Sequence, residues 1–229
     1  MKRILGYIPI VMLAVQAVFP AARLIAALCG WNIAPANGCA YAAFLAAVSV
    51  AGVVLMAKRE QRSWAMACVS IALPLSLVNL ILLPGLGDAI MICVAAVNSV
   101  VCLLAFSYGR GLRLLRVLMG ILSGMLAMAA AAVMFMVIVM GDFGMNTVVR
   151  ELPSDDGRYV AQVIDSDQGA LGGSTVVRVK RTRLLGVPME NIVKLDRRVW
   201  MGDWGLAHEV GVMWEDADTL VVNGIEYDF

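Results

Sequence analysis

The chain has 229 residues, of which 61% are hydrophobic and 15% are charged, and its mean hydropathy is +0.84. Soluble domains average about half apolar and a quarter charged residues, so this composition excludes an ordinary soluble protein. The net charge of +1 combines two unequal parts: residues 1–141 hold nine basic and two acidic side chains, whereas residues 142–229 hold nine basic and fifteen acidic ones. The acidic second part argues against a nucleic-acid partner.

Apolar stretches in residues 1–140 predict a polytopic α-helical membrane bundle of about five spans. Each stretch is close to the ~20 residues that a helix needs to cross a ~30 Å hydrocarbon core. The expected spans are residues 4–22, 40–57, 64–83, 89–107 and 117–140. The first partner implied by this pattern is the lipid bilayer.

Charges in the loops predict the orientation of the bundle. Basic residues occur at the N-terminus and in residues 58–62 and 110–116, whereas the loops 30–39 and 84–88 contain no Lys or Arg. Basic loops favour the cytoplasmic side of a membrane. We therefore expect a plasma-membrane protein with a cytoplasmic N-terminus and an extracytoplasmic C-terminal domain; an even number of spans would place that domain inside.

Small residues at helical spacing predict helix-packing faces in two of the spans. Lipid does not drive apolar helices together, so helices associate where small side chains let their backbones approach. The expected packing residues are Ala43, Ala47 and Ala51 in the second span and Gly120 and Gly124, a GxxxG pair, in the fifth.

Two cysteines, Cys29 and Cys39, lie at the ends of the first loop expected outside the cell. An oxidising exterior permits a disulfide between them. Two unpaired thiols at the membrane interface are an equally supported alternative.

Residues 146–229 change from a helical to a two-residue period and predict a small antiparallel β domain, arranged as a sheet or a sandwich of about six short strands. Tyr159, Ala161 and Val163 fall on one face of an expected strand. Asn223-Gly224 is the residue pair that a type I′ hairpin turn prefers, so it predicts a closing hairpin.

Two motifs in this domain resemble those of a bacterial family known only as a domain of unknown function. Residues 154–159 read S-D-D-G-R-Y and look like the family's S-P-D-G-K-Y hairpin, and residues 214–224 read W-E-D-A-D-T-L-V-V-N-G and look like its W-x-D-x-D-T-V-x-I-N-G ending. The similarity covers about residues 148–228, although Leu171-Gly172 stand where the family has threonines. It implies an envelope-exposed β domain and no activity.

The sequence predicts no catalytic, cofactor-binding or metal-binding residues. The one histidine, His208, precedes Glu209 but lacks the second histidine of a zinc-peptidase motif. Asp165 and Asp167 begin like a calcium loop, but no acidic residue follows at the required spacing. We take His208 and the two aspartates as structural residues.

Three functions are compatible with these observations. The first is a non-enzymatic integral membrane protein that anchors an extracytoplasmic β domain for binding or regulation at the cell envelope, with an envelope protein, a peptide or a wall component as its partner. The second is a small transporter or transporter subunit, suggested by prolines in two of the spans. The third is an enzyme with a site at the junction of the membrane and the domain, for which Asp88 and His208 are the candidate residues.

Overall fold

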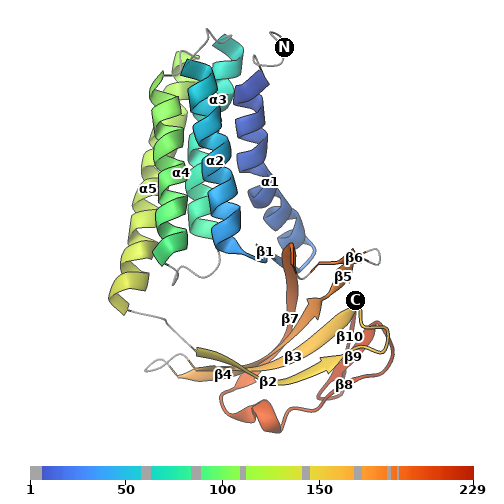
Figure 1. Ribbon diagram of the computed structural model, residues 1–229. Helices are drawn as coiled ribbons and strands as arrows, with labels where there is room; N and C mark the ends of the chain where they lie inside the picture. The colour runs from blue at the N-terminus through green and yellow to red at the C-terminus, as the bar shows by residue number, and fades with distance from the viewer. Residues whose placement is uncertain are drawn as a thin grey trace. The chain divides into compact units, whose positions relative to one another are not determined.

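The computed structural model describes residues 7–57, 63–83, 89–108, 112–140, 145–167, 172–184, 187–189 and 191–229. The chain forms two compact units (Figure 1). The helical unit comprises Met1–Leu24 and Asn37–Gly141, and the β unit comprises Ile25–Ala36 and Asp142–Phe229. The basic loop 58–62 and the loop 84–88, on which the predicted orientation partly depends, lie outside the described residues.

Among the described residues up to Met140, five helices account for most of the chain, as the apolar stretches predict. They are α1 (Ile8–Leu28), α2 (Gly38–Ala57), α3 (Ser63–Leu82), α4 (Ala89–Tyr108) and α5 (Arg113–Met140). Within the described residues, four helical stretches are long and apolar enough to cross a membrane: Ile8–Leu28, Gly38–Ala57, Ile90–Ser107 and Arg113–Phe135. Helix α3 contributes a shorter apolar stretch, Ala67–Leu82.

Helix α1 extends past Ala22, where the first span was expected to end. Arg23 therefore lies within the helix, and its Nη1 donates a hydrogen bond of 2.9 Å to the carbonyl oxygen of Leu82. Leu82 is the last residue of α3, and carbonyls in the last turn of a helix lack partners within that helix. The Arg23 guanidinium thus supplies a hydrogen-bond donor to a carbonyl at the C-terminal end of α3.

In α2, the small residues predicted to pack lie one position from the residues that are buried within this chain. Ala43, Ala47 and Ala51 are exposed, and the buried residues of the helix are Ala42, Leu45, Ala46, Ser49 and Gly52. Small residues occur on both sides of this helix, and Ser49 selects the buried side because its hydroxyl needs partners away from lipid. The close approach occurs at Gly52, where an added Cβ would collide with the Met12 side chain.

The two glycines of the predicted GxxxG pair in α5 have different surroundings. Gly120 is half-buried, and a Cβ placed there would lie 3.7 Å from the Phe106 ring. Gly124 is exposed, with no atom within 4 Å of such a Cβ. The buried positions of α5 are Ser123 and Ala130, so its contact face is rotated away from Gly124.

The β unit contains two main antiparallel sheets, which confirms the predicted antiparallel β architecture. The larger sheet has the order β1-β7-β4-β3-β2 and the smaller one β10-β9-β8, with β5-β6 as a short pair. The strands are β1 (Asn32–Pro35), β2 (Met145–Pro153), β3 (Tyr159–Asp167), β4 (Gly173–Arg181), β5 (Arg183–Leu184), β6 (Val187–Pro188), β7 (Val193–Asp203), β8 (Val212–Trp214), β9 (Thr219–Val222) and β10 (Ile225–Asp228). A short 3₁₀ helix, η3 (Leu206–His208), precedes β8.

One apolar cluster fills the β unit, with buried side chains from β3, β4, η3, β8 and β9. Tyr159, Ala161 and Val163 all belong to it, on the face where the two-residue period places them. The hairpin between β9 and β10 turns at Asn223 and Gly224, whose φ angles of 50° and 81° are those of a type I′ turn.

Strand β1 was not expected from the sequence. It lies between α1 and α2 and pairs antiparallel with β7, from Asn32↔Asp196 to Pro35↔Val193. Trp31, just before it, packs against the apolar cluster of the β unit. The β unit is therefore larger than the predicted domain of residues 146–229, because it includes the segment that joins the first two helices.

Candidate functional site

A network of polar side chains lies inside the helical unit. Gln16 of α1 donates from Nε2 to Ser49 Oγ of α2 at 3.1 Å and to Asn98 Oδ1 of α4 at 3.0 Å. Ser49 Oγ donates to Asn98 Oδ1 at 2.8 Å. Asn79 Nδ2 of α3 donates to the backbone oxygen of Gln16 at 2.8 Å, and Tyr41 OH of α2 donates to Asn79 Oδ1 at 3.2 Å. The network thus joins four helices.

Burial makes this network the main polar feature of the bundle. Gln16, Asn79 and Asn98 are each 1% exposed and Ser49 is 0% exposed. Amide and hydroxyl groups that are removed from water are costly unless they find partners, and here they bind one another. These four side chains are neutral, so they can orient helices but cannot carry charge as the ionisable groups of pumps and transporters do.

The sequence identifies part of this network. Gln16, Asn79 and Asn98 stand out as polar residues in apolar spans. Ser49 and Tyr41 do not, because serine and tyrosine are common in membrane helices and neither carries a spacing signal. Their partners lie on other helices, 49 positions away for Ser49 and Asn98. Only the packing of the helices brings them together.

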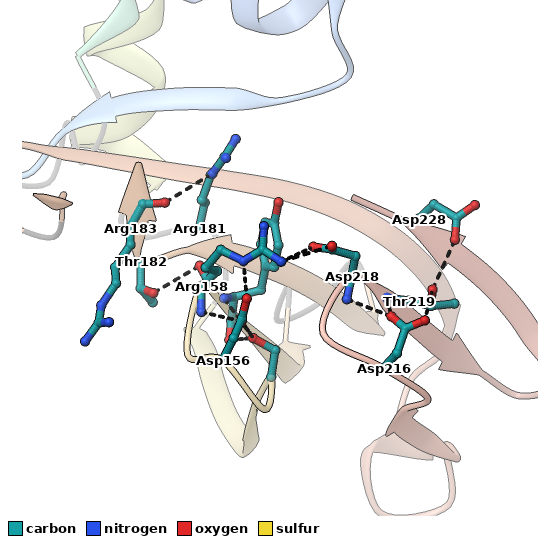
Figure 2. Close-up of polar contacts among 11 residues, drawn as sticks. Asp156, Arg158, Arg181, Thr182, Arg183, Asp216, Asp218, Thr219 and Asp228 are labelled. Carbon is teal, nitrogen blue, oxygen red and sulfur yellow. Dashed lines mark hydrogen bonds and ion pairs between the residues drawn. The ribbon is translucent and has the colours of Figure 1, made fainter. Parts of the chain in front are cut away.

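In the β unit, the two motifs that suggest a family resemblance meet in one place (Figure 2). Arg158 of the first motif lies between two carboxylates: its Nε pairs with Asp156, and its Nη2 lies 3.0 Å from Asp218 of the second motif. Tyr159 and Trp214, one from each motif, stack with ring centroids 6.2 Å apart. The two motifs are therefore in contact twice: at the surface through Arg158 and Asp218, and in the core through Tyr159 and Trp214.

The aspartates of this surface hold turns. Asp156 Oδ1 accepts a hydrogen bond from the Arg158 backbone N–H at 2.9 Å, and Asp216 Oδ1 accepts from the N–H groups of Asp218 and Thr219 at 2.8 and 2.7 Å. Hydrogen bonds from the backbone N–H and the side chain of Arg158 lower the pKa of Asp156 to about 2. Backbone donors also lower the pKa of Asp216. Both carboxylates therefore stay ionised at neutral pH.

Below this surface lies an aromatic cluster of four rings. Tyr159 is central: its ring centroid lies 6.5 Å from that of Trp31 and 5.6 Å from that of Phe229. The guanidinium groups of Arg158 and Arg181 lie 5.8 and 5.6 Å from the Tyr159 centroid. Such contacts stabilise a fold and fix the positions of cationic side chains at its surface.

Among the described residues, no group of three or more His, Cys, Asp or Glu side chains is placed to hold a metal ion. His208 lies in η3 and is exposed. The aspartates described above each have a structural partner in a turn. The polar residues of this surface therefore have roles in the turns of the β unit.

The predicted disulfide remains a prediction. Cys29 is an exposed thiol in the β unit, and Cys39 is a half-buried thiol in the helical unit.

Comparisons with known proteins returned no match: no family model, no curated protein and no solved structure matches this chain. The resemblance of the two β motifs to a domain of unknown function therefore stays a prediction.

Proposed function

We propose that this chain is an integral membrane protein whose helical unit anchors the β unit outside the cytoplasm, where the β unit binds a protein, a peptide or a wall component of the cell envelope. The observation that carries this proposal is the double attachment of the β unit. Its residues come from both Ile25–Ala36, between two apolar helices, and Asp142–Phe229, after the last helix. A β unit attached twice to apolar helices remains at the membrane, as a surface receptor or regulator requires.

The surface of the helical unit supports the membrane location. Leu24, Val18 and Met128 are 63–69% exposed, and many other large apolar residues are exposed on the same helices. Such surfaces are rare in water-soluble monomers. The distribution of basic residues among the loops supports the cytoplasmic N-terminus.

The exposed apolar residues of the β unit support binding as its role. Trp204 is 56% exposed and Met213 is 61% exposed. Tryptophan and methionine are enriched in protein interfaces, and tryptophan is common among the residues that dominate binding energy. We propose that these two positions contact the partner.

Transport and catalysis have less support. The polar network contains amides and hydroxyls that bind one another across the helices, so interhelical stabilisation accounts for it. His208 is exposed and belongs to no group of potential metal ligands among the described residues. We therefore place these two functions after binding.

Reporter fusions after Phe229 test the orientation. A phosphatase that is active only after export should be active in this fusion, and a reporter that is active only in the cytosol should be silent. The reverse pattern would overturn the extracytoplasmic placement of the β unit.

Photo-crosslinking in the native membrane tests binding. A photoreactive amino acid replaces Trp204 or Met213 in the full chain, and the matched control carries it at Val18, an exposed position of α1. We expect a discrete adduct of constant mass from Trp204 or Met213 and none from Val18. Identical adduct patterns at all three positions, or no adduct from the β unit, would contradict the proposal.

A further inference from the structure

Positive charge is concentrated in one part of the acidic β unit. Residues 173–203 contain seven basic and three acidic side chains, a net charge of +4, whereas the rest of residues 142–229 contains two basic and twelve acidic ones, a net charge of −10. The basic stretch contains β4 and β7, which are neighbours in the larger sheet. The sheet therefore has a basic region that the overall charge conceals.

Strand register places several of these cations on one face. Val177 and Val179 of β4 point into the apolar cluster, so Arg178 and Lys180, which alternate with them, point to the opposite face. Arg178 lies directly across from Arg198 of β7. Like charges at directly opposed positions of an antiparallel pair are destabilising, so this pairing is favourable when an anion lies between the two guanidinium groups.

One acidic side chain lies among these cations. Asp196 Oδ2 is 3.8 Å from Arg178 Nη1, and Asp196 Oδ1 accepts a hydrogen bond of 3.1 Å from Asn32 Nδ2. Arg198 is exposed, and the contact found for its guanidinium is a long one, 3.9 Å to Met201 Sδ. The local charge of Arg178, Arg198 and Asp196 is therefore +1, with Arg198 available for an anion.

These side chains border a hollow of about 380 Å³, which we call the basic hollow. It is lined by four polar or charged residues, Asn32, Arg178, Asp196 and Arg198, and by Ala27, Gly30 and Trp31. Ala27 belongs to the last turn of α1. Nearby in the same helix, Ile25 and Leu28 are 63% and 80% exposed. A cationic hollow is thus bordered by the end of an apolar helix.

We propose that the basic hollow binds the phosphate group of an anionic phospholipid, with the acyl chains beside Ile25 and Leu28 in the last turn of α1. Arginine suits this ligand because its planar fork of donors matches phosphate oxygens. Basic pockets beside membrane helices bind lipid headgroups in this way. The inference requires that α1 lies in the membrane, and it does not depend on the side that the β unit faces or on the partner proposed above.

Native mass spectrometry of the full chain in detergent tests the proposal. The chain is titrated with phosphatidylglycerol or with phosphatidylcholine, and the fraction with one bound lipid is measured. The test variant is Arg178→Gln/Arg198→Gln, and the matched control is Arg181→Gln/Arg183→Gln, which removes the same charge at positions that do not border the basic hollow. A third variant, Arg178→Lys/Arg198→Lys, keeps the positive charge and removes the planar guanidinium groups.

We expect phosphatidylglycerol to bind the unmodified chain more tightly than phosphatidylcholine, and its affinity to fall about tenfold or more in the Gln test variant because two cations near a headgroup are lost. The control should retain its affinity, and the Lys variant should be intermediate. Equal losses in test and control, or no preference between the lipids, would overturn the proposal.

Two further measurements complete the test. Inorganic phosphate is added as a competitor at concentrations from that of the lipid up to the millimolar range. Displacement of phosphatidylglycerol by an equal concentration of phosphate would show a site for free anions and would overturn the lipid assignment. Circular dichroism checks that each variant is folded. If the Gln variant is unfolded, the Lys variant decides, and unchanged lipid affinity in it would contradict a role for the arginine forks.

Discussion

The two units of this protein place polar and apolar side chains in opposite ways. In the helical unit, Gln16 and Asn98 are 1% exposed while Met128 is 69% exposed. In the β unit, Val163 and Leu220 are 0% exposed, and charged residues such as Lys194 and Arg198 are exposed. An apolar core below a charged surface, as in the β unit, is the arrangement of a domain that contacts water. An apolar surface around polar interior residues, as in the helical unit, is the arrangement of a helix bundle that contacts lipid. The contrast shows that the surface of the helical unit suits lipid and the surface of the β unit suits water.

Trp31 gives the sharpest test of this difference between the units. It lies between two apolar helices in the sequence, but it packs against the apolar core of the β unit. We expect Trp31→Ala to destabilise the β unit by about 3 kcal/mol, the lower end of the range for buried aromatic residues, since Trp31 is half-buried. Pulse proteolysis of the β unit in increasing urea measures this loss in the full chain. Trp204→Ala, at an exposed tryptophan of the same unit, is the control and should cost clearly less; equal costs would break the assignment of Trp31 to the β unit.

The second test addresses the interior of the helical unit. Gln16→Leu removes the side chain that bonds Ser49 and Asn98, and we expect a loss of about 1–2 kcal/mol because hydrogen bonds between membrane helices contribute amounts of this size. Unfolding by sodium dodecyl sulfate, followed by circular dichroism, measures the change. Val18→Ala, on the exposed side of the same helix, should have little effect. A more stable Gln16→Leu variant would show that the network opposes folding.

The third test concerns the turn between β9 and β10. Gly224 has a φ of 81°, which a residue with a side chain adopts at a cost of about 1–2 kcal/mol, so Gly224→Ala should destabilise the β unit by that amount in the same proteolysis assay. Gly211→Ala is the matched control, because its added methyl group would lie 3.6 Å from Asn223 Oδ1, an ordinary contact. Similar losses in both variants would argue against a strained turn.

The smallest effect is a pH dependence confined to the β unit. Hydrogen bonds from Arg158 lower the pKa of Asp156 from 3.8 to about 2. A carboxyl group with a lowered pKa in the folded state stabilises the fold above its unfolded pKa, and this contribution is lost as the pH falls through the folded value. We therefore expect the stability of the β unit to fall between about pH 4 and about pH 2. Asp156→Asn should reduce this slope in urea unfolding at several pH values; an unchanged slope would contradict the role of Asp156.

The sequence predicts the elements of both units well where the signal is local. The apolar stretches, the alternation of Tyr159, Ala161 and Val163, and the Asn223-Gly224 turn each depend on neighbouring residues. The packing face of α2 depends on another helix. Small residues occur on two sides of α2, and the sequence alone does not show that Ser49 meets Gln16 and Asn98.

Strand β1 and the basic hollow were beyond prediction for the same reason. Four residues, Asn32–Pro35, carry too short a pattern to indicate a strand, and their partner β7 lies far along the chain. Arg178 and Arg198 are ordinary surface residues in sequence. The register of β4 and β7 is needed to show that these two arginines lie opposite each other.

The pairing of β1 with β7 sets an order of events during synthesis. Asn32 and its partner Asp196 are 164 residues apart, so at about 5–20 residues per second β1 emerges from the ribosome roughly ten to thirty seconds before β7. During this interval its backbone donors and acceptors lack their final partner, and strand edges of this kind attract foreign strands. The segment that completes the β unit is therefore made long before the strand with which it pairs.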